Sequence, residues 1–232
     1  MTKPLPDIVG PDLNILVCGL NPGLTAAATG RHFAGRGNRF WKVLHLSGFT
    51  PRLLLPEQDQ ELLEYGIGLT CVVDRPTAEA SEVQDDEFIR GAQGVERRVR
   101  ELKPRYVAFL GKAAYAAILG STAFDWGEQT RTFGGCKVWL LPNPSGRNRA
   151  FSTLQLVAAY SALLRACSGN NAPVFGPQLD GSGTVGSHAL DGTEAGRQDG
   201  AGVTLISRCG QTGRHPGQGS ISLEPSDRAD PS

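Results

Sequence analysis

The sequence predicts a three-layer α/β/α fold, in which a short, mostly parallel central sheet is covered by helices on both faces. Short apolar segments alternate along the chain with longer segments whose apolar residues recur every three or four positions. Strands that alternate with helices are joined by crossover connections, which make the strands parallel. The strand segments are almost continuously apolar, as expected for strands buried on both faces.

Four segments are predicted to form the strands of this sheet. Each is a short apolar run that ends near glycine, proline or a charged residue. They span residues 14–18, 67–73, 106–110 and 137–141.

Helices are predicted between these strands and after the last one. Residues 85–102 have the clearest helical spacing of apolar side chains, and Pro104 ends this segment. The other predicted helices span residues 38–48, 56–65, 112–119 and 151–166. In the last of them, the side chains expected to face the core are Leu154, Val157, Ala158, Ala159 and Leu163.

The composition changes near Ser168, which predicts a folded domain over residues 1–167 and a disordered, glycine-rich tail over residues 168–232. The tail holds thirteen of the thirty glycines, one phenylalanine, and neither tryptophan nor tyrosine. So little apolar surface cannot offset the entropy lost on ordering. The formal net charge is zero, but the charge is unevenly distributed along the chain. Residues 1–167 carry 19 Lys and Arg against 16 Asp and Glu, whereas the tail carries 4 Lys and Arg against 7 Asp and Glu.

The cysteines and histidines exclude several kinds of site. Five cysteines and four histidines form no spacing typical of a zinc or iron–sulfur site, so we expect no metal and no cofactor. An odd number of cysteines near apolar runs is typical of reduced thiols in a cytoplasmic protein. The N-terminus lacks an apolar signal core, and no apolar run approaches the roughly 20 residues of a membrane helix. We therefore expect a soluble intracellular protein without a membrane partner.

Two asparagine-proline turns carry the most chemical information in the chain. Gly-Leu-Asn-Pro-Gly (19–23) follows the first predicted strand, and Asn-Pro-Ser-Gly-Arg-Asn-Arg (143–149) follows the last. Ligands of an open α/β sheet bind beyond the carboxyl ends of its strands, so the two turns are predicted to line one site. The first turn supplies an amide and glycines that allow close backbone approach, and the second supplies an amide and cations. Either turn alone is also compatible with a purely structural role.

Arginines gather near both turns. Arg31, Arg36 and Arg39 follow the first turn, and Arg147 and Arg149 lie in the second. This placement is typical of a nucleic-acid-binding surface, although an ordinary solvated surface gives the same pattern.

Several short motifs occur in a fixed order over residues 7–166. They are Gly-Leu-Asn-Pro-Gly-Leu (19–24), Thr-Gly (29–30) with Phe-Ala (33–34), Gly-Asn-Arg-Phe-Trp-Lys (37–42), Val-Asp-Arg-Pro-Thr (73–77), Leu-Gly-Lys (110–112), Trp-Gly (126–127) and Leu-Pro-Asn-Pro-Ser-Gly (141–146). In this order they resemble the mismatch-specific uracil/thymine-DNA glycosylase family, which belongs to the uracil-DNA glycosylase superfamily. The tail has no counterpart in this resemblance.

The resemblance implies a monofunctional, monomeric DNA repair enzyme of the bacterial cytoplasm. Its partner would be double-stranded DNA with a mispaired or damaged base. It would remove uracil, and in some members thymine or ethenocytosine, mispaired with guanine. The target base must be flipped out of the duplex, at a cost that is smallest for a mispaired base.

The resemblance also assigns roles in a base pocket. Asn21 would position the attacking water, because an amide cannot accept a proton as a carboxylate does, and we therefore expect a slow enzyme. Phe33 would stack on the flipped base, and backbone donors near it would stabilise the departing anion. Ala26 and Cys71 stand where some relatives have serine and lysine, which affects base selectivity. The other expected pocket residues are Gly19, Leu20 and Asn143.

The second turn would contact the DNA. Arg147 takes the position of a wedge that fills the gap left by the flipped base, where leucine is familiar in the family. An arginine can fill that gap and also hydrogen-bond the orphaned guanine. Ser145 and Arg149 would face phosphates, and Gly146 lies between Ser145 and the wedge.

Two alternatives remain open at this stage. The single-strand-selective uracil glycosylases share the first turn, but their second turn begins with histidine, so Asn143 argues against them. A non-catalytic module that binds damaged DNA or a nucleotide would use the glycine turn as a phosphate cradle and would leave glycosidic bonds intact.

Overall fold

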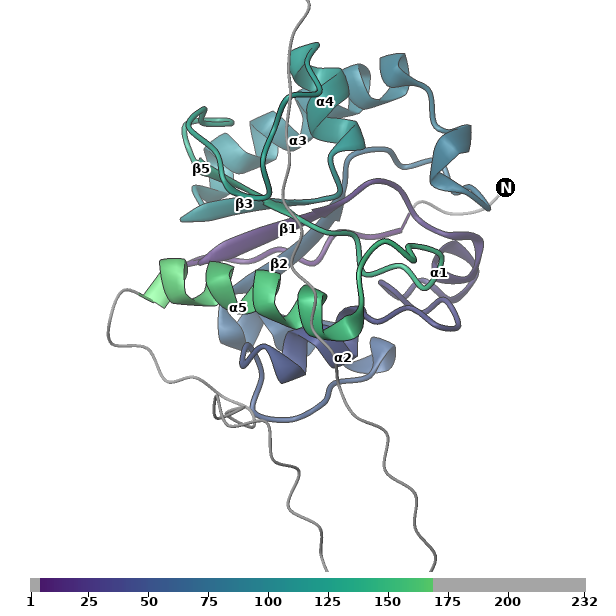
Figure 1. The fold of residues 1–232 in the computed structure, drawn as a ribbon, viewed down its shortest axis with the longest axis vertical. Coiled ribbons are helices and arrows are strands. Elements are labelled where there is room, and N and C mark those ends of the chain that lie inside the picture. Colours follow the sequence, from purple (N-terminus) through teal and green to yellow (C-terminus); the bar gives the residue numbers. More distant parts are fainter. Residues whose placement is uncertain (1–4, 169–232) are drawn as a thin grey trace, which may run out of the picture. The chain divides into compact units, whose positions relative to one another are not determined.

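The computed structural model describes residues 5–168, which form one five-stranded sheet with helices on both faces (Figure 1). The strands lie in the order β2-β1-β3-β5-β4. All neighbours pair in parallel except β4, which is antiparallel to β5. The strands are β1 (Ile15–Gly19), β2 (Ile67–Cys71), β3 (Tyr106–Leu110), β4 (Gly127–Glu128) and β5 (Lys137–Leu141).

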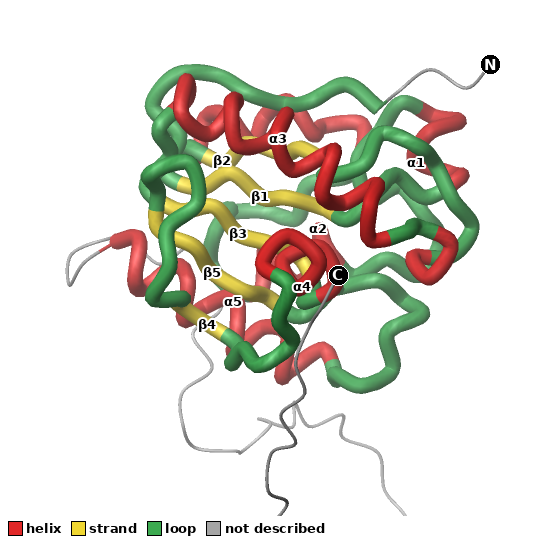
Figure 2. The backbone as a smooth tube through the Cα atoms, turned by 90° about the horizontal axis from the view of Figure 1, so that it is seen from above, coloured by secondary structure: helices red, strands yellow, loops and turns green. Residues whose placement is uncertain are grey.

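The sheet separates two apolar layers. On one face, α3 and α4 pack against strand residues such as Leu16 and Val107, and on the other face α2 and α5 pack against residues such as Val17 and Ala108 (Figures 1 and 2). The helices are α1 (Leu24–Thr29), α2 (Phe40–Leu46), α3 (Asp85–Leu102), α4 (Ala113–Leu119) and α5 (Thr153–Ser168), with the 3-10 helices η1 (Pro56–Tyr65) and η2 (Ala80–Glu82).

The predicted three-layer architecture with a mostly parallel sheet is confirmed. The antiparallel edge strand β4 and the helix α1 were not predicted. Strand β4 has only two residues and α1 only six, which is too few to show a periodic pattern. Residues 169–232, which hold nearly all of the predicted tail, lie outside the described residues.

Helix α5 buries a face that agrees only in part with the predicted one. Leu154 is 69% exposed and Ala158 is also exposed, whereas Val157 and Leu163 are buried as expected. The stripe that faces the sheet includes Tyr160, whose hydroxyl donates to the carbonyl of Pro142 at 3.4 Å. A tyrosine is readily buried when its hydroxyl finds such a partner.

Helix α3 approaches the end of β2 closely because of one glycine. A Cβ atom built on Gly91 would lie only 2.0 Å from the carbonyl oxygen of Val72, just beyond β2. Val72 in turn donates its N–H to the carbonyl of Gly19 at 2.9 Å. The close approach of α3 therefore supports the segment that follows β2, next to the first asparagine turn.

Gly91→Ala is expected to lower the free energy of unfolding by about 1–3 kcal/mol, because the added methyl group overlaps a backbone carbonyl. Gly94, on the same helix, has no atom within 4 Å of a built Cβ. Gly94→Ala should therefore stabilise the protein by about 0.5–1 kcal/mol through helix propensity. Urea unfolding measures the free energy of unfolding of both variants. Equal changes in that free energy for the two variants would contradict the close packing of α3.

Candidate active site

The carboxyl edge of the sheet carries both asparagine turns. The first turn leaves β1 at Gly19, and the second leaves β5 at Leu141. Strand β3 lies between these two strands, and its last residue Leu110 pairs with Leu141. The segments after β3 and β5 also stay close, since a Cβ on Gly111 would lie 3.8 Å from the Cβ of Asn143. The two turns thus leave the same edge of the sheet.

The first turn is held by the segment that follows β2, residues 72–79, which we name the flanking segment. Val73 donates its N–H to the carbonyl of Leu20 at 3.0 Å, and Thr77 donates its N–H to Pro22 at 3.1 Å. These bonds continue the pairing of β1 with β2 beyond the ends of both strands. The backbone of the first turn is therefore fixed on one side.

The side-chain amide of Asn21 is oriented by the flanking segment. Its Nδ2 donates to the carbonyl of Arg75 at 3.0 Å and to Oγ1 of Thr77 at 2.8 Å. A carbonyl only accepts hydrogen bonds, so the NH₂ group must face Arg75 and the oxygen must face the other way. Among the described residues, none donates a hydrogen bond to Oδ1. This leaves a fixed acceptor at the carboxyl edge of the sheet.

Thr77 is a site residue that the sequence analysis missed. Its hydroxyl donates to the carbonyl of Glu79 at 2.6 Å, so it accepts from Asn21, and its side chain is buried. The motif at 73–77 was the signal that could have found it, but a motif does not say which residue it contacts 56 positions away.

Arg75 anchors the flanking segment to α3. Its guanidinium donates to both carboxylate oxygens of Glu87 at 2.8 Å and to the carbonyl of Glu82 at 2.9 Å. The bonds from Arg75, together with the backbone N–H of Gln84, lower the pKa of Glu87 to about 2. The carbonyl of Arg75 accepts the hydrogen bond from the Asn21 amide, and the side chain of the same residue is fixed by Glu87 and Glu82.

Phe33 has a backbone conformation that is rare for a large side chain. Its φ is +56°, in the left-handed region. One face of its ring stacks on the buried ring of Phe40, with centroids 3.9 Å apart and planes 21° apart. Such strain persists only where the surroundings impose it, and it is frequent at functional sites.

The neighbours of Phe33 impose this conformation. The buried His32 directs Nε2 to the carbonyl of Pro6 at 2.8 Å, and its own carbonyl accepts from the indole of Trp41 at 3.2 Å. Arg31 pairs with the buried carboxylate of Asp59 at 2.9 Å. Residues 31–32 are thus fixed by three separate contacts immediately before Phe33.

His32 is expected to make stability depend on pH. Burial lowers its pKa, and this effect outweighs the hydrogen bond to Pro6 and the charge of Asp59, which raise the pKa. Below about pH 6.5 the unfolded chain therefore binds a proton more readily than the folded protein does, so the free energy of unfolding falls as the pH falls. His32→Gln, which keeps a donor, should show a smaller decrease in Tm between pH 7.5 and 5.5. An unchanged decrease would contradict the assignment.

The second turn is a compact loop stabilised by its own side chains. Oδ1 of Asn143 accepts the N–H of Ser145 at 3.0 Å, and Oγ of Ser145 accepts the N–H of Arg147 at 3.3 Å. The amide of Asn148 donates back to the carbonyl of Asn143 at 2.8 Å. The loop presents Arg147 at its exposed tip.

Arg147 reaches the same flanking segment that holds Asn21. Its Nη1 donates to the carbonyl of Ala78 at 2.7 Å and to a carboxylate oxygen of Glu79 at 3.2 Å. The side chain remains 67% exposed, and an ion pair this exposed is weak. The two turns therefore contact one segment, while Arg147 is held only loosely.

The other predicted site residues lie around these groups. Ala26 is buried in α1, and Gly19 is buried at the end of β1, whereas Leu20 is partly exposed. Gly146 and Arg149 are exposed in the second turn. Thus every predicted site residue lies in or directly beside the two turns, α1 or the segment that carries Phe33.

Two of the three arginines after the first turn already have partners within the protein. Arg31 pairs with Asp59, and Arg39 donates to backbone carbonyls of the second turn. Arg39 is therefore a poor candidate for a nucleic-acid surface because its charge turns inward, whereas the side chain of Arg31 stays 40% exposed beside Asp59. Arg36 is exposed.

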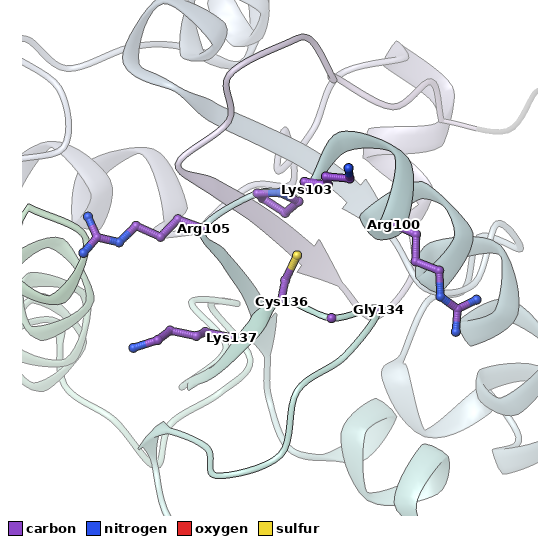
Figure 3. A pocket seen from close by; sticks show the side chains of 8 residues that line it. Arg100, Lys103, Arg105, Gly134, Cys136 and Lys137 are labelled. Atoms are coloured by element: carbon purple, nitrogen blue, oxygen red, sulfur yellow. The ribbon is translucent and has the colours of Figure 1, made fainter.

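A pocket of about 710 Å³ lies elsewhere, at the amino-terminal edge of β3 and β5 (Figure 3). Three of its four cations have partners: Lys137 pairs with Glu128, Arg100 pairs with Glu96, and Arg105 donates to the carbonyl of Cys167, whereas Lys103 is the fourth. The side chains of Arg105 and Lys137 extend away from Cys136 in Figure 3. The pocket is therefore a poorer candidate site than the edge that carries the two turns.

The described residues hold no group of three or more metal-ligating His, Cys, Asp or Glu side chains. The four cysteines among them are free thiols. Within residues 5–168, no helix combines the length and apolar character needed to cross a membrane.

Comparison with known proteins assigns the family. A solution NMR structure from Methanosarcina acetivorans, named "putative Uracil DNA glycosylase", is 22% identical with a TM-score of 0.48, and the match covers 70% of this chain and 98% of that one. The sequence model of the Uracil DNA glycosylase superfamily matches residues 6–165, which is most of the chain. The chain therefore belongs to the uracil-DNA glycosylase superfamily.

Proposed function

We propose that this protein is a monofunctional glycosylase that removes uracil mispaired with guanine in duplex DNA and leaves an abasic site. Membership of the superfamily supports a glycosylase that acts on uracil in DNA. The observation that carries the proposal is the amide of Asn21, whose NH₂ group is fixed by the flanking segment so that Oδ1 is left as an acceptor. Thymine and ethenocytosine opposite guanine are further candidate substrates.

In the proposed reaction, Oδ1 of Asn21 accepts a hydrogen bond from the attacking water. The bond between C1′ and N1 breaks, its electron pair leaves with uracil as an anion, and the water oxygen bonds to C1′ while its proton passes to solvent. Because Asn21 cannot take that proton, we expect attack on an oxocarbenium-like sugar whose bond to the base is already largely broken. Orientation of the water, rather than basicity, then provides the catalysis.

The proposed base pocket lies between the first turn and Phe33. One face of the Phe33 ring already packs on Phe40, so its rotamer is fixed before a base binds. A flipped base can therefore stack on the other face at little further cost in side-chain entropy. We propose that Gly19, Leu20, Ala26 and Asn143 complete the pocket. Backbone N–H groups near Leu20 and Phe33 would stabilise the departing uracil anion.

Thr77→Val is expected to slow single-turnover cleavage about tenfold, because the amide of Asn21 loses one of its anchors at a cost of about 1.4 kcal/mol. Valine keeps the shape of threonine, so the fold should survive. Thr77→Ser keeps the hydroxyl and is the matched control, for which we expect nearly the wild-type rate. Equal rates for the valine and serine variants would show that the hydroxyl does not position Asn21.

A panel of labelled oligonucleotides tests the substrate class. Uracil is placed opposite guanine, opposite adenine and in a single strand, and thymine or ethenocytosine is placed opposite guanine. After incubation, alkali cleaves the strand at any abasic site. We expect cleavage to be fastest for uracil opposite guanine. Equal cleavage of the single strand would instead support the single-strand-selective type, and binding without any cleavage would support a non-catalytic module.

A further inference from the structure

The guanidinium of Arg39 makes an unusual set of contacts with the second turn. It donates to four backbone carbonyls: Nε to Pro144 at 3.4 Å, Nη2 to Ser145 at 3.2 Å and to Asn148 at 2.7 Å, and Nη1 to Phe151 at 2.7 Å. Its own backbone N–H also donates to Pro144 at 3.0 Å. One residue thus binds the loop on both sides of Arg147.

These contacts account for the shape of a loop that has no regular secondary structure. Backbone carbonyls turned inward need donors, and the loop cannot supply enough of them itself. Arginine offers five N–H donors in a rigid planar fork, so it can bind several carbonyls at once. Among the described residues, no carboxylate pairs with Arg39. Its positive charge therefore interacts with the carbonyl groups of the loop.

A second contact fixes the loop against the same segment. A Cβ built on Gly146 would lie 2.4 Å from the carbonyl oxygen of Gly37, so the two backbones touch directly. Arg39 is followed at once by Phe40 and Trp41, both buried in the core at the start of α2. The second turn is therefore attached to a rigid part of the protein.

The same part of the protein carries the ring proposed to hold the base, since Phe40 stacks on Phe33. We propose that Arg39 is a positioning residue that fixes the second turn, and with it Arg147, at a set distance from the base pocket. This inference rests on the proposed function for its consequence in DNA, but the clamp itself is a property of the free protein. A lysine in its place has three donors on one nitrogen and cannot reach carbonyls on both sides of Arg147.

Amide hydrogen exchange of the full-length protein tests the clamp without any activity. In Arg39→Lys, peptides that cover residues 143–151 should exchange at least tenfold faster, while peptides from β1 and β3 exchange as in the wild type. The control is Arg90→Gln, which removes an equal charge from an arginine that is exposed on α3 and paired with Asp86. Exchange in residues 143–151 that matches the control would overturn the proposal.

Binding then tests the consequence for DNA. The probe is a duplex with a tetrahydrofuran abasic analogue opposite guanine, so that no chemistry is involved. We expect Arg39→Lys to weaken binding about tenfold, and Gly146→Ala, which pushes the loop away from Gly37 with Arg39 intact, to do the same. Unchanged affinity in both variants would overturn the positioning role. If the wild-type protein releases no uracil from any duplex, the proposed function fails, whereas the exchange result still decides on the clamp.

Discussion

Asn21→Ala should slow uracil release from a duplex with one G·U pair by about 10²–10³-fold, as is typical when one preorganised polar group is lost from a site. The alanine has no oxygen to hold the attacking water. The hydrogen bonds to Arg75 and Thr77 disappear as well, but the backbone of the turn keeps its bonds to the flanking segment. DNA affinity should therefore stay close to that of the wild type.

Single-turnover kinetics with excess enzyme measures this loss without interference from slow product release. Affinity is measured with the tetrahydrofuran duplex, and Tm shows whether the variant is folded. An unchanged rate would refute the role of Asn21. A parallel loss of rate and affinity would point to collapse of the turn rather than loss of the water.

Arg147→Ala should slow cleavage of the G·U duplex about 10–100-fold, which corresponds to about 1.4–2.8 kcal/mol. The reason is that the wedge offsets part of the few kcal/mol that unstacking the base costs. Cleavage of uracil that is already unpaired, opposite an abasic analogue, should be nearly unaffected. In the free protein Arg147 makes only weak, exposed contacts with Ala78 and Glu79, so we expect it to leave them on DNA binding.

Arg149→Ala is the matched control for Arg147→Ala, because it removes the same charge two residues away. If Arg149 contacts a phosphate, its loss should weaken binding to both duplexes alike and should reduce the dependence of affinity on salt. Equal losses on the two substrates for Arg147→Ala would contradict a wedge and would assign Arg147 to the phosphates too.

The periodic elements of the fold could be predicted from the sequence. Helix α3 and strands β3 and β5 have the predicted bounds, because their apolar patterns are long or uninterrupted. The buried face of α5 was predicted only in part, because Leu156 and Tyr160 were not assigned to it although they lie at helical spacing with Leu163. Residues 56–65 form a 3-10 helix rather than an α-helix, a distinction that the acidic, proline-led pattern did not contain.

The candidate site could be predicted only as far as its local motifs reach. The two turns and Asn21 stand out in the sequence because asparagine, proline and glycine occur together after apolar runs. Thr77 was missed because its importance comes from a contact with Asn21 across 56 residues. Arg39 was misjudged because a sequence shows a charge but not its partner, and this charge turns inward to backbone carbonyls.

Release of free uracil from a G·U duplex by a stoichiometric amount of the wild-type protein tests the proposed glycosylase activity most directly. Chromatography measures the free base, and alkali treatment of the same sample measures abasic sites. We expect equal amounts of free uracil and abasic sites, and a much slower formation of both by Asn21→Ala. Tight binding of the duplex with no uracil released would contradict the proposed activity.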